Sequence, residues 1–373
     1  MDSTTENRES LLLASYAKHS ADSAGRVHDE PPHPYRGPFQ RDRDRVVHSS
    51  AYRRLAHKTQ VFTGEMGDYH RTRLTHTLEV ASIARTIGRV LRLNEDLIEA
   101  LCLVHDIGHP PFGHTGEEVL DERLAEHGGF NHNRQALRIV ELLEARYPGF
   151  PGLNLTREVL SGQQSRASRE VEAAQSQPLL EVQVVDAADS IAYDSHDADD
   201  ALEFGLLQLD QLLEVPLWRE AARSVELADA SLDPVQQRRA IVHRLIETLV
   251  SDLITASQRR LADSGVGTVA QVQAFGRRLI EPSQATAEQK AELEDFLFHR
   301  VYRHPALLEE RSVACRALEE MFDRFLQHPE LLPGEYSSVA ETEGLPRAVG
   351  DYLSAMTDRH ALQQYRQPTP TTR

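Results

Sequence analysis

Apolar residues recur along most of the chain at the three- and four-residue spacing that is typical of amphipathic helices. One apolar stripe runs through residues 75–91, and a second runs through residues 97–104. Asn94 stands before the second stripe as a helix cap, and Gly108 with the prolines that follow it ends that helix. A strand would show strict alternation of apolar and polar residues, and no segment shows this convincingly. The pattern therefore predicts a mostly α-helical fold.

A third helix is predicted over residues 179–202, where Asp189, Tyr193 and Asp197 follow one another by a single turn along nearly one line. Similar patterns predict further helices at about 206–229, 235–264, 286–300, 305–327 and 340–363. The chain has 373 residues, which is enough to bury a substantial core. We expect an all-α fold that forms a single large globular domain.

The two ends of the chain are more polar than its middle. Residues 1–40 mix polar residues with a proline-rich patch, which predicts a flexible N-terminal arm. The globular domain should span residues 41–366, with a core at about 70–200 that carries the site and a helical C-terminal part at about 205–366. Residues 367–373 contain two prolines and are expected to form a disordered tail.

Net charge and apolar content exclude some classes of function. The chain carries 41 Lys and Arg residues against 58 Asp and Glu residues, a formal net charge of -17. A protein that coats DNA needs clustered cations, so this balance argues against one. No apolar run approaches the roughly 20 residues that span a bilayer, and the stretch at residues 11–14 is too short for a signal-peptide core. We expect a cytoplasmic protein with no membrane partner.

The densest chemistry lies between His105 and Glu118, where three histidines and three carboxylates occur within fourteen residues. The adjacent His105 and Asp106 at a helix end offer an imidazole nitrogen and a carboxylate oxygen to one divalent ion, with Mg or Mn expected first and Fe, Co or Ni as alternatives. His76 and Asp189 each interrupt an apolar helical face, where an unpaired polar group would be costly. Taken singly, each has a structural explanation, as a hydrogen-bonded core histidine or as an aspartate that caps a helix or pairs with arginine.

Two further carboxylates lie close behind these histidines. Thr115 with Glu118 three residues on fits a capping box, which would explain Glu118 structurally. Glu117 lacks such an explanation and lies three residues after His114. At that spacing the carboxylate can orient the imidazole and raise its basicity. Such a pair can accept or deliver a proton beside a metal-bound water.

A basic stretch precedes the first candidate ligand. It runs from residue 41 to residue 73 and includes Arg53, Arg54, Lys58, Arg71 and Arg73 together with Tyr52, Tyr69 and His70. Arginine forks bind phosphate oxygens through two parallel hydrogen bonds, which suits a polyphosphate ligand. A single arginine on such a stretch is usually solvated. Arg73 is the exception because it precedes His76 by three residues and so lies near the same ion.

Several motifs in fixed order resemble the deoxynucleoside triphosphate triphosphohydrolases, the dGTPase-like branch of the HD superfamily. They lie at residues 41–45, 58–62, 71–76, 105–117 and 189–197, and further agreement follows at 302–305 and 351–359. The resemblance covers residues 40–366 and implies an HD-domain helical fold. His-Asp alone would indicate only the superfamily, whereas the combined order is specific to this branch.

The resemblance implies a role for each matching residue. The metal ligands would be His76, His105, Asp106 and Asp189, and the catalytic pair would be His114 and Glu117. The substrate contacts would be Arg73 and His109 at the phosphates, Gln60 and Asp197 at the deoxyribose, Tyr193 against the sugar where it rejects a 2'-hydroxyl, and Lys58 in the basic stretch. The family reaction is attack of water on the α-phosphate of a deoxynucleoside triphosphate, which releases a deoxynucleoside and intact triphosphate. A homo-oligomer is also implied, and a deoxynucleotide effector is a further expected partner.

Two segments depart from the family pattern. Asn131 stands where the family commonly has a glutamate, and residues 161–177 are polar and atypical. Both are expected near the nucleotide pocket, so they bear on base preference and on any regulatory site more than on the metal or the chemistry.

Two alternative functions remain. The first keeps the metal site but acts on another phosphate ester, such as a nucleotide monophosphate, a cyclic nucleotide or a guanosine polyphosphate, and the set of Gln60, Tyr193 and Asp197 argues against it. The second is a nucleotide sensor or nucleic-acid-binding scaffold without turnover. The complete ligand quartet and catalytic pair argue against that alternative, although single-stranded nucleic acid could occupy the basic groove.

Overall fold

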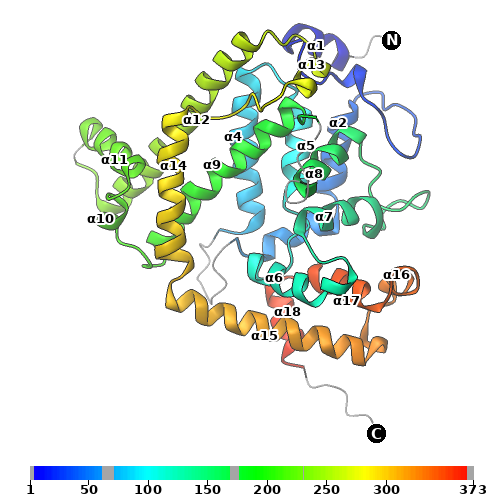
Figure 1. The fold of residues 1–373 in the computed structure, drawn as a ribbon. Coiled ribbons are helices and arrows are strands. Elements are labelled where there is room, and N and C mark those ends of the chain that lie inside the picture. Colours follow the sequence, from blue (N-terminus) through cyan, green and yellow to red (C-terminus); the bar gives the residue numbers. More distant parts are fainter. Residues whose placement is uncertain (1–3, 61–70, 169–175, 230, 368–373) are drawn as a thin grey trace.

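The computed structural model describes residues 4–60, 71–168, 176–229 and 231–367, and within these ranges the fold is all-α (Figure 1). The described residues contain no β-strand longer than an isolated bridge. The helices are α1 Thr4–Leu12, α2 Pro38–Val47, α3 Ser50–Arg54, α4 Arg73–Val90, α5 Glu95–His105, α6 Gly113–Arg123, α7 His132–Arg138, α8 Arg157–Ser168, α9 Leu180–Glu203, α10 Leu209–Leu212, α11 Pro216–Ala228, α12 Pro234–Ser264, α13 Val269–Ala274, α14 Gln284–Leu297, α15 Pro305–Gln327, α16 Ser337–Glu343, α17 Leu345–Ser354 and α18 Asp358–Tyr365. The predicted fold class is confirmed.

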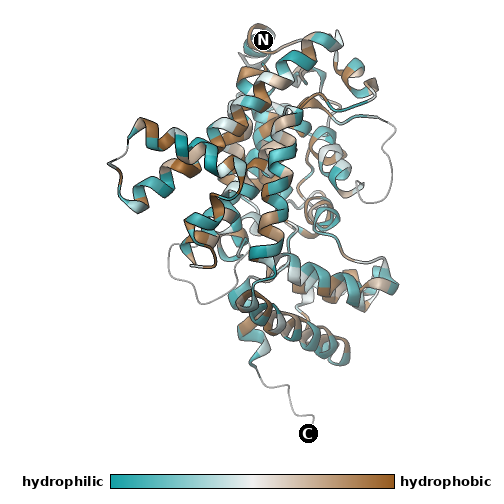
Figure 2. Cartoon of the chain, turned by 60° about the vertical axis from the view of Figure 1, so that its left-hand side comes forward, coloured by the Kyte–Doolittle hydropathy of each residue, from teal (hydrophilic) through white to brown (hydrophobic). Residues whose placement is uncertain are grey.

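Helix α4 lies at the centre of the larger apolar core, where it packs against α5 and α9 (Figure 1). Helix α2 covers α5, and α12 packs against α9. Val80, Ala84 and Ile87 of α4 are fully buried, as their spacing predicts. His76 is buried on the same face with 1% exposure. Figure 2 shows hydrophobic and hydrophilic residues mixed along the helices of the chain, as expected of amphipathic helices that share a core.

A smaller apolar core joins α6 to the C-terminal helices α15, α17 and α18, in the lower part of Figure 1. Its fully buried members include Leu120 of α6, Leu318 and Met321 of α15 and Val349 of α17. Phe112, in the loop between α5 and α6, is buried in the same cluster. The loop that carries the predicted His-Asp chemistry is therefore anchored in this second core.

The N-terminal segment differs from its prediction as a flexible arm. Glu9 of α1 is buried and accepts hydrogen bonds from the Ser20 backbone N–H at 2.6 Å and from Asn94 Nδ2 at 3.1 Å. The backbone N–H of Lys18 donates to Glu181 at the start of α9, at 2.9 Å. Specific hydrogen bonds to the helical core thus order this polar sequence, and the prediction of a flexible arm is wrong for the described residues from 4 onward.

Three local predictions need correction or fall outside the described residues. The helix expected over residues 340–363 is three helices, since Gly344 adopts a φ of 94° between the first two and Thr357 caps the third. Helix α6 already begins at Gly113, so Thr115 lies inside it and forms no capping box with Glu118. The predicted cap at Asn94 is confirmed by its bond from the Leu97 N–H. The predicted tail lies outside the described residues apart from Gln367.

Hydrogen bonds from the C-terminal helices strap two loops together. Asp358, the first residue of α18, accepts from the backbone N–H and hydroxyl of Thr59 at 2.8 and 2.7 Å and from the Phe112 N–H at 3.0 Å. Lys58 Nζ donates to the carbonyls of His109 at 2.5 Å and Ser354 at 2.8 Å. The loop after α5 is therefore held from both sides by residues far away in the chain. Separately, no helix of the described part is both long and apolar enough to cross a membrane.

We expect Asp358→Ala to lower the free energy of unfolding by about 2–4 kcal/mol, because it leaves buried donors of Thr59 and Phe112 without their charged acceptor. Urea denaturation followed by circular dichroism measures this change. Asp295→Ala is the matched control, since the Asp295 side chain is 75% exposed. Equal stability of the two variants would show that the strap contributes nothing to the fold.

Candidate active site

Three side chains from three helices converge at the centre of the larger core. His76 of α4, His105 at the end of α5 and Asp189 of α9 place one donor atom each within 4.8 Å of one another. His76 Nε2 lies 3.1 Å from Asp189 Oδ1, and His105 Nε2 lies 3.7 Å from the same oxygen. Ligands around an ion at about 2.1 Å stand roughly 3 Å apart, so only small shifts would close this group around a cation.

Asp106 lies at the edge of this group and is tied to two cationic or polar neighbours. Its Oδ1 is 4.0 Å from His105 Nε2. Arg73 Nη1 donates to both of its carboxylate oxygens at 3.0 Å, and His109 Nδ1 lies 2.8 Å from Oδ1. Burial alone would raise the pKa of Asp106, but Arg73 and His109 hold it well below its usual value. The carboxylate is therefore ionised and fixed in direction.

The donor set fits a divalent cation. His105 Nδ1 donates to the Cys102 carbonyl, which leaves Nε2 with its lone pair, and Nε2 is buried with no hydrogen-bond partner among the described residues. Burial lowers the pKa of His105 and so favours the neutral imidazole that a metal needs. Burial opposes ionisation of Asp189, yet His105, His76 and Arg166 keep its pKa low. Two carboxylates with two imidazoles suit the ions from Mn to Ni as well as Mg.

Arg166 of α8 supports Asp189 from outside the group. Its Nη2 lies 3.1 Å from Asp189 Oδ2, and its Nε lies 2.8 Å from Asp186 Oδ1. The opposite oxygen of Asp186 accepts from Arg278 at 2.8 Å. Second partners of this kind fix the direction of a metal-binding carboxylate. Arg166 was not among the predicted site residues, because α8 shows mostly polar residues and no apolar face that would give its direction.

The predicted pair of His114 and Glu117 is joined by a third residue. Glu117 accepts from the His132 backbone N–H at 2.8 Å, and its two oxygens lie 2.8 and 2.9 Å from His132 Nδ1. His114 Nδ1 is 3.6 Å from Glu117, which is too long for a hydrogen bond, and its side chain is 55% exposed. Burial would raise the pKa of Glu117, but His114 and His132 lower it. The structure thus places the carboxylate primarily on His132.

His132 also connects the pair to the metal-ligand group. Its ring stacks on His109 with a centroid distance of 3.9 Å and an interplanar angle of 23°. Gly108 permits this approach, since a Cβ there would meet the His132 carbonyl at 2.0 Å and the Ala136 nitrogen at 2.4 Å. Burial, Arg73 and His132 together lower the pKa of His109 well below its usual value. A neutral His109 therefore lies between Asp106 on one side and His132 on the other.

The residues predicted to hold the sugar have buried polar atoms. Asp197 Oδ2 accepts from the hydroxyl of Tyr302, and Oδ1 is buried without a partner among the described residues. Burial, reinforced by Asp200 and Asp194, raises the pKa of Asp197 to about 7. The Tyr193 ring lies 6.4 Å from the Tyr302 ring, and Gln60 Oε1 is likewise buried without a partner.

A cleft of about 380 Å³ opens over this region. It is lined by Asp189, Arg166 and Tyr193, by His132 and Asn133 at the start of α7, and by Asp186, Ser190, Asp194 and Glu294. The cleft therefore brings a candidate metal ligand, the glutamate-bound histidine and the predicted sugar contact together within one space. A volume of this size suits a small organic ligand.

Comparison with known proteins agrees with this architecture. Residues 73–194 match the family model of the HD domain, and residues 280–367 match that of the phosphohydrolase-associated domain. A deoxyguanosinetriphosphate triphosphohydrolase-like protein of Geobacter sulfurreducens is 45% identical over 95% of this chain and 94% of its own. Proteins of the same description from Geobacter metallireducens, over 96% of both chains, and Ralstonia pickettii, over 95% of this chain and 94% of its own, are each 44% identical.

The chain belongs to the dGTPase-like HD phosphohydrolases. The predicted family is thus confirmed, and the HD match includes all four predicted metal ligands. Asn131, the departure from the family pattern, caps α7 through bonds from the Asn133 and Arg134 N–H groups at 3.0 and 3.2 Å. An asparagine at this position therefore shapes the helix start that presents His132.

Two parts of the predicted basic stretch lie apart from the cleft or outside the described residues. Lys58 is 3% exposed, and its two carbonyl bonds make it a tether of the loop. Burial, with Arg54 as the next contribution, lowers its pKa to about 7. Arg71 pairs with Asp200 and Glu79. Tyr69 and His70 lie outside the described residues. The substrate contact of Lys58 stays a prediction.

Divalent ions should stabilise the protein against heat, because an ion that binds only the folded state shifts the unfolding equilibrium. We expect Mn²⁺ at a hundredfold excess over its dissociation constant to add about 2.7 kcal/mol, a rise of a few degrees in Tm. His105→Ala should abolish this rise, and His243→Ala, an exposed histidine of α12, should keep it. Differential scanning calorimetry measures all three. A full rise in His105→Ala would remove His105 from the ligand set.

Proposed function

We propose that the chain hydrolyses deoxynucleoside triphosphates, dGTP among them, to a deoxynucleoside and inorganic triphosphate. The observation that carries the proposal is the convergence in one cleft of Asp189, His132 and Tyr193. Asp189 is a proposed ligand of the ion, His132 belongs to the proposed proton-transfer group, and Tyr193 lies at the proposed sugar site. The similarity to deoxyguanosinetriphosphate triphosphohydrolase-like proteins supports a purine deoxynucleotide as one substrate.

His76, His105, Asp106 and Asp189 are proposed to hold a divalent ion. When bound, such an ion neutralises charge on phosphate oxygens and activates water for attack. The chain's own residues complete the phosphate site. Arg73 Nε is buried without a partner in the described part of the chain while Nη1 is engaged by Asp106, so the guanidinium has a donor left for an anion. Fixed cations and donors of this kind stabilise the charge of the transition state without reorganisation.

Proton transfer is proposed to involve Glu117, His132 and His114 together. Glu117 accepts from His132 Nδ1, while the Asn133 amide lies 3.0 Å from Nε2, so both nitrogens of His132 are engaged. His114 is more than half exposed and stands 5.7 Å from His109 between ring centroids. His114 is therefore the member of the group that is free to protonate the leaving deoxynucleoside oxygen. The hydrogen bond between Glu117 and His132 keeps these two groups in fixed positions beside it.

Sugar selection is proposed to rest on Asp197, Gln60 and Tyr193. Asp197 Oδ1 and Gln60 Oε1 are buried and have no hydrogen-bond partner among residues 4–60, 71–168, 176–229 and 231–367, so they suit the hydrogen of a 3'-hydroxyl group. The bond from Tyr302 holds Asp197 in place. A site built around buried acceptors rejects analogues that leave them unpaired, so these residues support recognition of a specific sugar.

The decisive assay separates the products of each dNTP and of GTP, with Mg²⁺ or Mn²⁺ present. We expect intact triphosphate and a deoxynucleoside, no turnover of GTP, and a loss of at least about 10³-fold in kcat/KM for Asp106→Asn. Ion-exchange chromatography distinguishes triphosphate from pyrophosphate and orthophosphate. Release of either shorter phosphate would assign the chain to another HD phosphohydrolase, and no turnover with all four dNTPs would favour a sensor.

Loss of the proton-transfer group should lower kcat more than substrate affinity. We expect Glu117→Gln and His132→Ala each to reduce kcat by about 10²–10⁴-fold, since general acid–base groups contribute on that scale. The control is His127→Ala, an exposed histidine five residues before His132. Steady-state kinetics with dGTP provides the comparison. If His132→Ala kept wild-type kcat, the bond between Glu117 and His132 would have no part in the reaction.

A further inference from the structure

A cavity of about 340 Å³ lies where the segment between α6 and α7 meets the C-terminal helices α16 and α17. It is lined by residues 127–131, by Arg134, Gln135 and Arg138 of α7, and by Glu343 and Arg347. All of these residues belong to the described ranges, and none of them lines the cleft that contains Asp189. The cavity therefore lies between the parts of the chain that match the HD domain and the phosphohydrolase-associated domain.

Two arginines of this lining are held by the backbone of one glycine turn. Arg134 Nη1 donates to the Gly128 carbonyl at 3.0 Å, and Arg347 Nη2 donates to the carbonyls of Gly129, at 3.0 Å, and His127. Both glycines have a positive φ, 88° and 67°. A Cβ at Gly128 would lie 3.6 Å from Arg347 Nη2, and one at Gly129 would lie 3.5 Å from Arg134 Nη2. The two guanidinium groups thus approach the same turn from two different helices.

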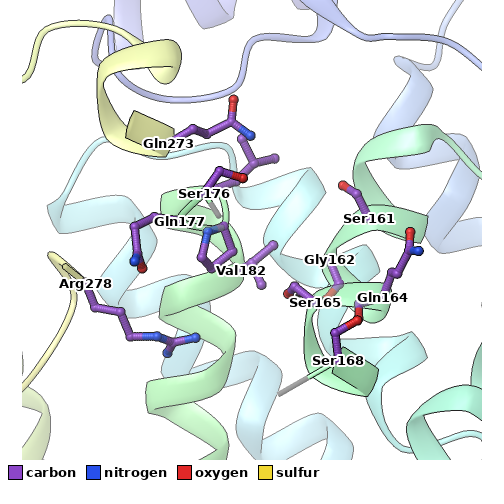
Figure 3. A pocket seen from close by; sticks show the side chains of 12 residues that line it. Ser161, Gly162, Gln164, Ser165, Ser168, Ser176, Gln177, Val182, Gln273 and Arg278 are labelled. Carbon is purple, nitrogen blue, oxygen red and sulfur yellow. Dashed lines mark hydrogen bonds between the residues drawn. The ribbon is translucent and has the colours of Figure 1, made fainter. Parts of the chain in front are cut away.

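Backbone carbonyls orient these guanidinium groups without neutralising them. Arg278, which Figure 3 shows between α8 and α9, pairs instead with a carboxylate oxygen of Asp186 at 2.8 Å. In the described part of the chain, no carboxylate oxygen lies within 4.0 Å of the guanidinium nitrogens of Arg134 or Arg347. A guanidinium has five N–H donors, so each of the two keeps donors for a further acceptor.

The positive charges around the cavity are close enough to affect one another. Burial lowers the pKa of Arg347, and the charges of Arg138 and Arg134 lower it further. The carboxylates of Asp351 and Glu343 act in the opposite direction. Like charges at this spacing repel, and an anion between them relieves the repulsion.

The third arginine of the lining already holds an oxyanion. Arg138 Nη1 and Nη2 donate to the two oxygens of Glu343 at 2.7 and 3.1 Å, and its Nε and Nη2 donate to Asp351 at 3.1 and 2.6 Å. The nearby Asp121 accepts from the Phe130 N–H at 2.6 Å. The carboxylates of the chain are therefore engaged at Arg138 and at the backbone, and an added anion meets the other two arginines.

We propose that Arg134 and Arg347 bind the phosphate group of a small ligand in this cavity. A tetrahedral phosphate presents oxygens in several directions, so two guanidinium forks from different helices can each bind a different pair, whereas one fork suffices for a planar carboxylate. The volume lies at the lower end of the usual range of about 300–1,000 Å³ for small-ligand sites. The ligand is thus inorganic phosphate or a small phosphate monoester.

A phosphate in this cavity would connect α7 to α17 behind the candidate active site. Arg134 follows His132 by two residues on α7, and Arg347 belongs to α17. The same two helices are already joined by Gln135, whose Nε2 donates to Asp351 at 3.0 Å. The ligand would therefore add a second link between the helix that carries His132 and the C-terminal part of the chain.

The test is isothermal titration calorimetry of the full chain with inorganic phosphate and, separately, with glycerol 2-phosphate. EDTA is present, so that no divalent ion draws phosphate to the candidate active site. Arg134→Glu reverses the charge at an exposed position, and Arg347→Gln removes the second cation. Arg219→Glu is the matched control, because Arg219 is also exposed and also donates to a backbone carbonyl, that of Glu214, at 3.3 Å.

We expect wild type and Arg219→Glu to bind at least one of the two phosphates equally, and Arg134→Glu and Arg347→Gln to bind it at least about tenfold more weakly. The tighter of the two probes identifies the free anion or the ester as the ligand. Arg134→Lys should lose less affinity than Arg134→Glu, because lysine keeps the charge and loses only the fork.

Two results would overturn the proposal. One is the absence of binding of either probe to wild type at millimolar concentration. The other is equal affinity of wild type and Arg134→Glu, which would place the phosphate elsewhere on the chain. Circular dichroism verifies folding, and Arg134→Glu decides alone if Arg347→Gln does not fold. Because the assay involves no hydrolysis, a chain that fails to hydrolyse dNTPs still gives a readable result here.

Discussion

The buried ion pair between Arg73 and Asp106 is the interaction on which the arrangement of the site depends. Both side chains are nearly inaccessible, with residue exposures of 1% and 3%, and Arg73 Nη1 meets both carboxylate oxygens at 3.0 Å. Removing one partner of such a pair leaves an uncompensated charge in the core, at a cost of about 3–5 kcal/mol. Arg73 begins α4 and Asp106 follows α5. The pair therefore fixes the two helix ends from which His76 and His105 reach the same point.

The parts of the candidate site that lie on long helices could be predicted from the sequence pattern. The period of an amphipathic helix indicates which way each side chain points. A polar residue on an apolar face, such as His76 or Asp189, is therefore expected to point toward the core. The helix expected over residues 179–202 is α9, Leu180–Glu203, and the one expected over 305–327 is α15 with the same bounds. The helix cap at Asn94 could also be predicted from the local sequence.

Contacts between distant segments could not be predicted in the same way. His132 sits at the first position of a short helix, where no period indicates its direction, and only the folded chain brings it to Glu117. The contact of Arg166 with Asp189 could not be predicted for the same reason, because Arg166 lies on the polar helix α8. The N-terminal residues were misjudged because their buried groups are polar: Glu9 is satisfied by specific hydrogen bonds, and composition alone cannot distinguish such a segment from a solvated one.

Because Asp358 lies far along the chain, the two loops that it joins are synthesised long before it during translation. Residue 358 follows Phe112 by 246 positions and Thr59 by 299, and it is their shared acceptor. A ribosome that adds about 5–20 residues per second delivers all four candidate metal ligands well before α18 emerges. The nascent chain thus contains the candidate ligands before it contains the helix that restrains the loop between α5 and α6.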